Sequence, residues 1–394
     1  MSYTEVTNES WWSRIKNSFG NIIFGLILFL VAFPFLFWNE GRAVYQAKTL
    51  EEGINIVTSI DANQIDKNNE GKLVHLTGQA ESNETLGDDR FGIVQENIIK
   101  LRRVVQMYQW QENQQSRTEE KLGGSTETIT TYTYAKEWNS KVTNSNNFKQ
   151  SEEHQNPPEM SFNSGIFQAK EVIFGAFTLP SSLVNHINNY QNLPVTNTTF
   201  KQIPEEIQNK LQVHNNYYYM GKNPAQPQIG DLKIRFEVVL PNTVSIIAKQ
   251  LGSTFEFYTT QVGGTIELLE YGKVSATNMF KHEQEFNIIL TWVFRLVGFI
   301  IMFIGLNLIF GVLRTLAAIV PFIANIVGFL GNIVNFIIAT TLSLITIAIA
   351  WIFYRPLLGI ALLILAGSLL YLLKFVHKQP QEEIMPITQL SNSK

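Results

Sequence analysis

The sequence predicts a multi-pass α-helical membrane protein with a large β-rich α+β extramembrane domain inserted between the first and second spans. The prediction rests on two contrasts in composition. Residues 19–38 carry no charge, and residues 288–376 contain no acidic residue and four basic ones, Arg295, Arg314, Arg355 and Lys374. Residues 39–287 instead hold 29 Asp or Glu and 22 Lys or Arg, a composition typical of a water-exposed domain. Because a membrane helix needs ~20 apolar residues, both charge-poor regions are expected in the bilayer.

The apolar run at 19–38 is interpreted as a retained transmembrane helix, preceded by an N-terminal cytoplasmic tail at 1–18. A secretory signal peptide is the alternative, but its apolar core is usually ~7–15 residues long and ends at a small-residue cleavage site. No such site follows Trp38. Aromatic residues flank the run on both sides, as expected where a helix crosses the two interfaces.

Residues 288–376 are expected to contain transmembrane helices 2–4, at about 291–313, 334–354 and 357–376, followed by a C-terminal tail at 377–394. The segment 315–333 is apolar but is interrupted by proline, glycine and asparagine. It is therefore predicted to be an interfacial helix, with a fifth span as the alternative. Four spans place both termini on one side. Lys and Arg near the ends favour termini in the cytoplasm and residues 39–287 in the lumen or periplasm.

The intervening domain is predicted to be mostly strands. The segments 99–112 and 126–140 are rich in β-branched and aromatic residues and are separated by Gly123-Gly124, so they are expected to form a long hairpin. Residues 231–260 resemble a meander, because Pro241-Asn242 and Gly252 mark turns. Helices are expected at 42–52, 180–193 and 275–287.

Several collinear segments resemble one known family. They are NEGRAVYQAKTLEEG (39–53), NNEGKLVHLTG (68–78), IKLRRVVQMYQWQE (99–112), TYTYAKEWNSKVTNSNNFK (131–149), MFIGLNLIFGVLRTL (302–316) and ATTLSLITIAIAWIFYRPL (339–357). Together they are similar to the transmembrane protein 43 family, also called LUMA. The resemblance implies one N-terminal span, a large lumenal domain and three C-terminal spans. It also implies self-association and the organisation of membrane protein assemblies, and it brings no catalytic residues.

A charged motif ends the first apolar run, at Asn39, Glu40, Gly41 and Arg42. Asn39 is expected to cap backbone groups where the helix leaves the hydrocarbon. Glu40 and Arg42 are expected to anchor the exit at head-group depth, where neither charge is desolvated. Gly41 is expected to let the backbone bend into the outer domain. Contact of this motif with a partner is the alternative.

Two further groups of residues are candidates for a structural or binding role. Gly298 and Gly305 lie on one helix face and permit close helix approach, within the chain or between protomers, and Asn307 is placed to make an interhelical hydrogen bond. An outer hairpin at Tyr354, Arg355 and Pro356 is predicted between the last two spans. Arg355 is expected either to pair with Glu40 or to bind lipid phosphate.

No catalytic, cofactor-binding or metal site is predicted. The chain has no cysteine, and its six histidines lack the i, i+4 spacing of a helical metal site. Phosphate-binding and nucleophile motifs are absent from the sequence. The net charge of −3 gives no reason to expect nucleic acid as a partner.

The leading functional hypothesis is a non-enzymatic, self-associating membrane scaffold that organises other membrane proteins through its outer domain. Its expected partners are the lipid bilayer, further copies of itself and other membrane proteins. A lipid- or peptide-binding module at the membrane face is the second hypothesis, a channel or transporter the third, and an enzyme the last. The expected location is the cytoplasmic membrane in a bacterium; for a eukaryote the family resemblance implies the endoplasmic reticulum and inner nuclear membrane.

Overall fold

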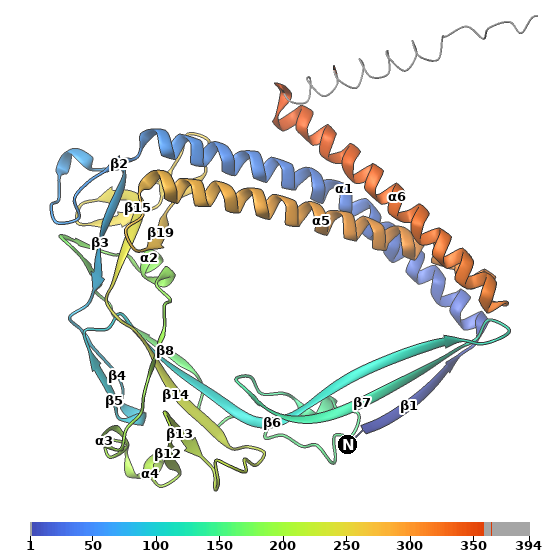
Figure 1. Ribbon diagram of the computed structural model, residues 1–394, viewed down its shortest axis with the longest axis horizontal. Coiled ribbons are helices and arrows are strands. Elements are labelled where there is room, and N and C mark those ends of the chain that lie inside the picture. The colour runs from blue at the N-terminus through green and yellow to red at the C-terminus, as the bar shows by residue number, and fades with distance from the viewer. Residues whose placement is uncertain (1, 358–363, 365–394) are drawn as a thin grey trace, which may run out of the picture.

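The computed structural model describes residues 2–357 and 364, and it combines long helices with a large β-rich domain (Figure 1). Three helices in this part of the chain are long and apolar enough to cross a membrane. They are α1 (Trp11–Ile56), α5 (Ala276–Ala317) and α6 (Pro321–Tyr354). The first is N-terminal and the other two are C-terminal. The predicted fourth span at 357–376 and the tail at 377–394 lie almost wholly outside the described residues.

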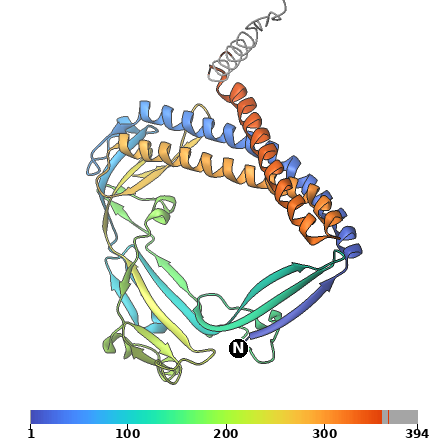
Figure 2. The same ribbon diagram turned by 45° about the vertical axis from the view of Figure 1, so that its right-hand side comes forward.

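The three long helices pack on one another (Figures 1 and 2). Helices α1 and α5 run side by side in opposite directions, and α6 returns across them. Apolar residues from all three helices form a buried core: Ala32, Leu36, Met302, Leu306 and Ala339. Tertiary packing therefore stabilises helices whose outward surfaces are apolar and suited to lipid.

The predicted interfacial helix at 315–333 is wrong as a separate element. Helix α5 continues to Ala317, the chain turns at 318–320, and α6 then runs unbroken through 333 into the predicted span at 334–354. Gly328 lies where α6 passes close to α5: a Cβ added there would lie 3.0 Å from Cδ of Arg314. Of the two glycines that interrupt this segment, Gly328 marks a packing contact between α5 and α6, whereas an added Cβ at Gly331 would meet nothing within 4 Å.

The β-rich domain contains two main sheets and two small ones. The eight-stranded sheet has the order β1 (Ser2–Glu9), β7 (Thr126–Asn139), β6 (Lys100–Glu120), β14 (Leu232–Val239), β13 (Tyr217–Met220) and β12 (Leu211–His214), with β11 (Gln191–Leu193) on β14 and β8 (Gly165–Gln168) on β6. The seven-stranded sheet has the order β10 (Phe177–Thr178), β9 (Ile173–Phe174), β3 (Leu73–Glu81), β15 (Asn242–Leu251) and β16 (Thr254–Glu256), with β19 (Leu268–Tyr271) on β15 and β2 (Thr58–Ser59) parallel to β3. The small sheets pair β4 (Thr85–Asp88) with β5 (Ile93–Glu96), and β17 (Tyr258–Thr259) with β18 (Thr265–Ile266). The short helices are α2 (Ser181–His186), α3 (Asn197–Phe200) and α4 (Glu205–Gln208).

The predicted hairpin is confirmed and is longer than expected. Strands β6 and β7 pair from Met107↔Asn139 to Glu120↔Thr126. The predicted meander at 231–260 is wrong, because β14 belongs to the eight-stranded sheet and β15 to the seven-stranded sheet. The turn at Pro241-Asn242 thus passes the chain from one sheet to the other.

One apolar core joins the two sheets, and a second joins the domain to the helices. The first core takes buried residues from both sheets, among them Leu76, Val105, Phe236 and Ile246. The second takes Leu50 from α1, Ile247 from β15 and Met279 and Phe280 from α5. The helical ends that leave the apolar region therefore pack directly on the domain.

The N-terminal segment is part of the domain and is not a free tail. Residues Ser2–Glu9 form β1, which pairs antiparallel with β7 from Ser2↔Thr133 to Glu9↔Thr126. The domain is therefore not a simple insertion between two spans, because its edge strand precedes α1. The partner of β1 is β7, which is rich in threonine and other β-branched residues. Because β7 is distant in the sequence, the sequence does not show that the two strands pair.

The chain closes on itself where the β6–β7 hairpin meets the start of α1 (Figures 1 and 2). Arg14 donates to the Gly124 carbonyl at 2.6 Å and pairs with Glu120 at 3.0 Å. The indole of Trp11 donates to the Thr315 carbonyl at 2.8 Å, so the α5–α6 turn joins the same contact.

The pairing of β1 with β7 differs from the predicted assignment of these segments to opposite sides of the membrane. Paired strands must lie on one side of any bilayer, so 2–9 and 126–133 share a side in this structure. The prediction had placed them on opposite sides, within 1–18 and 39–287.

Candidate functional site at the exit of helix α1

The motif at 39–42 lies within α1, which continues unbroken to Ile56. The expectation that Gly41 bends the chain is therefore wrong. Gly41 is small for a different reason: an added Cβ would lie 2.7 Å from the ring of Tyr354. The glycine makes room for the last turn of α6.

Glu40 is completely buried and fully paired. Its carboxylate accepts two hydrogen bonds from Arg295 of α5, at 2.6 Å from Nε and 2.9 Å from Nη2. The indole of Trp351 on α6 donates to the same carboxylate at 2.8 Å. A bidentate arginine and an indole N–H satisfy a charge that would otherwise be costly to bury. The prediction that Glu40 stays solvated is wrong, and the pair ties all three helices together.

Asn39 and Arg42 bind α5 one turn further toward the domain. The Asn39 amide donates to the Thr291 carbonyl at 3.0 Å, so it bonds to a neighbouring helix and does not cap its own. Arg42 donates to Asn287 Oδ1 and to Thr291 Oγ1, each at 3.0 Å. Asn287 in turn donates to the Ala43 carbonyl at 2.9 Å. These bonds make a polar seam between α1 and α5.

Arg355 lies beside this network but outside it. Helix α6 ends at Tyr354, and the Arg355 amide bonds to the Trp351 carbonyl at 2.7 Å. Within residues 2–357 and 364, no carboxylate lies within ion-pair distance of Arg355. The expected Glu40–Arg355 pair is therefore wrong, because the carboxylate of Glu40 is paired with Arg295 instead. Pro356 follows directly, and the second arm of the predicted outer hairpin lies outside the described residues.

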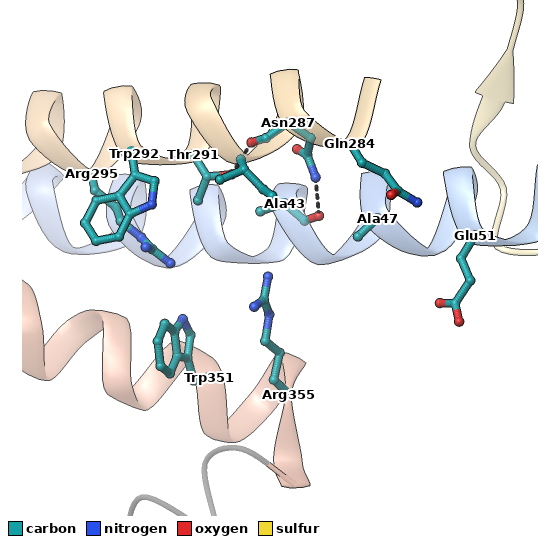
Figure 3. A pocket seen from close by; sticks show the side chains of 11 residues that line it. Ala43, Ala47, Glu51, Gln284, Asn287, Thr291, Trp292, Arg295, Trp351 and Arg355 are labelled. Carbon is teal, nitrogen blue, oxygen red and sulfur yellow. Dashed lines mark hydrogen bonds between the residues drawn. The ribbon is translucent and has the colours of Figure 1, made fainter. Parts of the chain in front are cut away.

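A cleft of about 620 Å³ opens between the three helices at this level (Figure 3). Arg295 and Trp292 reach into it from α5, and Trp351 and Arg355 from α6. Its remaining walls are Ala43, Ala47 and Glu51 of α1 and Gln284, Asn287, Ile288 and Thr291 of α5. The cleft thus combines two guanidinium groups with two indole rings at the end of the apolar helices.

The predicted glycine face is confirmed as a site of close helix approach, and the approach is within the chain. A Cβ on Gly305 would lie 2.7 Å from the Phe29 amide nitrogen and 2.8 Å from the Gly25 carbonyl. A Cβ on Gly298 would lie 2.4 Å from the Leu36 side chain. This face is covered by α1 and is not available to a second protomer.

Asn307 makes the expected interhelical hydrogen bond. Its side-chain oxygen accepts from the amide of Asn335 on α6 at 3.0 Å, and its own amide donates to the Phe303 carbonyl at 2.9 Å. The pair satisfies two amides that apolar helices would otherwise leave unpaired.

Sequence reasoning missed the partners of the motif, which are Arg295, Asn287, Thr291 and Trp351. It also missed Gly25 as the neighbour of Gly305, and Asn335 as the partner of Asn307. One signal was present for Arg295. A lone arginine in an apolar helix needs a partner, and Glu40 is the acid nearest to any apolar run. The others gave no signal, since tryptophan, glycine, hydroxyl and amide side chains occur at many positions of the chain.

Similarity to known protein sequences assigns the chain to a family. A family model described as "Transmembrane protein 43" matches residues 107–356. The mouse protein named "Transmembrane protein 43" is 34% identical over 369 residues, which is 90% of each chain. The human protein of that name is 34% identical over 87% of each chain. A Drosophila melanogaster homolog is 32% identical over 88% of this chain and 92% of its own. No solved structure matches. By this similarity, which runs from the β-rich domain through the helices that bury Glu40 and Arg295, the chain belongs to the transmembrane protein 43 family.

Proposed function

We propose that the protein is a non-enzymatic, self-associating membrane scaffold that organises other membrane proteins through its β-rich domain. One observation carries the proposal: β1 is the edge of the eight-stranded sheet and leaves one long side unpaired among the described strands. An edge of this kind can add a strand from another chain. A second copy of β1, placed antiparallel, would join two sheets symmetrically.

The composition of β1 supports this use. Its sequence, SYTEVTNE, contains no proline or lysine, the residues that commonly block edge pairing. Val6 lies in the middle of the strand and is 53% exposed. The glycine face, by contrast, is used within the chain, so self-association needs another surface such as this one.

The polar groups of the helices favour a scaffold over a channel or transporter. Glu40 and Arg295 neutralise each other, and Asn307 bonds to Asn335. These groups hold the helices together and form no continuous series of titratable side chains along the described spans. A transport pathway would usually need such a series.

Cross-linking of a single cysteine tests the proposal, because the chain has no native cysteine. With Val6→Cys we expect a disulfide-linked dimer in oxidised native membranes, since a symmetric antiparallel contact centred on residue 6, in the middle of β1, brings the two sulfurs together. Val94→Cys is the matched control, because Val94 on β5 is 52% exposed but lies in a small sheet away from β1.

Mass measurement gives a second readout. We expect the wild type to form an oligomer in mild detergent and Val6→Lys to weaken it, while Val94→Lys does not. A strict monomer in several detergents and in lipid nanodiscs would overturn self-association. Equal cross-linking at both cysteines would overturn the role of β1.

A further inference from the structure

We propose that the cleft beside Glu40 binds the phosphodiester of a glycerophospholipid with a net negative head group through Arg355. For brevity we call the cleft lined by Trp292, Arg295, Trp351 and Arg355 the exit cleft (Figure 3). The inference goes beyond the scaffold function and does not depend on it.

The charge in the exit cleft favours an anion. Arg295 is neutralised by Glu40, which accepts both of its hydrogen bonds. Arg355 points from α6 into the space facing α1, and no carboxylate of the described residues pairs with it. Glu51 lies at the domain end of the cleft (Figure 3). At the other end of the cleft, Arg355 therefore contributes one local positive charge, which matches the single charge of a phosphodiester.

The position of the cleft favours a lipid as the source of that phosphate. It lies where the apolar part of each long helix ends, and exposed Trp292 and half-buried Trp351 line it. Indole rings at this position are typical of head-group depth. Both rings also stack on the Arg295 guanidinium, at 4.6 and 5.6 Å from the ring centroids, which holds them in place.

An apolar path for an acyl chain begins at the same cleft. From Trp292, exposed apolar residues follow at every fourth position of α5: Leu296, Ile300 and Ile304. Residues spaced by four lie on one helix face, so they form a continuous stripe that runs from the cleft toward the middle of the apolar region. Inorganic phosphate has no apolar part that could contact this stripe, whereas the acyl chain of a lipid would lie along it.

Native mass spectrometry of the full-length protein tests the proposal. The protein is released from nanodiscs of phosphatidylcholine containing increasing fractions of phosphatidylglycerol, and bound lipid is counted. We expect retention of phosphatidylglycerol by the wild type and about tenfold weaker retention by Arg355→Gln, because a hydrogen-bonded charge is lost. Arg355→Lys keeps the charge and should retain most of the binding.

The control is Arg117→Gln, which removes the same charge from an exposed position on β6. It should retain phosphatidylglycerol as the wild type does. A second readout uses thermal stability in detergent: added phosphatidylglycerol should raise the melting temperature of the wild type and of Arg117→Gln, but not that of Arg355→Gln.

Three results would overturn the inference. Equal lipid retention by Arg355→Gln and Arg117→Gln would show that Arg355 holds no head group. Stabilisation by inorganic phosphate equal to that by phosphatidylglycerol would assign the cleft to a soluble anion. Loss of binding in Arg355→Lys as complete as in Arg355→Gln, with the wild-type melting temperature kept, would exclude recognition by charge.

Discussion

Replacing Glu40 by glutamine should destabilise the helical bundle more than any other single change in the motif at 39–42. The substitution keeps the volume of the side chain and its ability to accept from Trp351, so it removes the charge alone. Arg295 would then be left with a guanidinium that is 12% exposed and has lost its carboxylate. Removal of one partner from a buried ion pair costs about 3–5 kcal/mol.

The value expected here is about 3 kcal/mol, at the lower end of that range, because the pair lies near the end of the apolar stretch. At roughly 2–3 °C per kcal/mol, the melting temperature should fall by roughly 6–9 °C. The measurement is thermal unfolding of the purified protein in one mild detergent, followed by tryptophan fluorescence.

A double-mutant cycle isolates the pair. In Glu40→Gln combined with Arg295→Gln, two neutral amides replace two charges, so the double variant should be more stable than the sum of the single effects by about 2 kcal/mol. The matched cycle combines Glu40→Gln with Arg355→Gln, and these effects should add to within ~0.5 kcal/mol. Coupling of Glu40 to Arg355 with additivity toward Arg295 would refute the assignment of the pair.

Three other predictions follow from helix packing and strand pairing. Gly305→Leu should destabilise the α1–α5 contact by several kcal/mol, since even a Cβ would clash with the α1 backbone. Gly311→Leu on the same helix should have little effect, because nothing lies within 4 Å of an added Cβ. Equal losses of thermal stability in the two variants would contradict this packing. Asn335→Leu should cost about 0.6 kcal/mol or somewhat more in the same assay, since it breaks one interhelical hydrogen bond within the membrane, and a stabilised variant would show that the bond contributes nothing. Thr7→Cys with Thr128→Cys should form an intramolecular disulfide in native membranes, because these residues are paired across β1 and β7; a disulfide that forms in detergent but never in membranes would show that a bilayer separates the two strands.

The sequence by itself determined the class of the protein and the approximate positions of its apolar helices and its long hairpin. Charge-free runs of about 20 residues have few alternatives to a membrane helix, and the hairpin at 99–112 and 126–140 followed from β-branched residues flanking two glycines. The glycine face at Gly298 and Gly305 could also be predicted from the sequence, because helical periodicity fixes which residues share a face.

The sequence did not determine which residues meet. Glu40 resembled a solvated interfacial anchor because local sequence shows only that the apolar run has ended. Its partner Arg295 lies 255 positions away, and their contact depends on how α1 and α5 are paired along their length. The same limit applies to β1, whose partner β7 is more than a hundred residues distant.

Tertiary structure decided these points for a physical reason. The periodicity that marks a helix or strand acts over a few residues, whereas the burial of a charge depends on every element that surrounds it. Once α5 and α6 pack against α1, the site of Glu40 becomes inaccessible to water, and only a positioned guanidinium and an indole N–H make that burial tolerable.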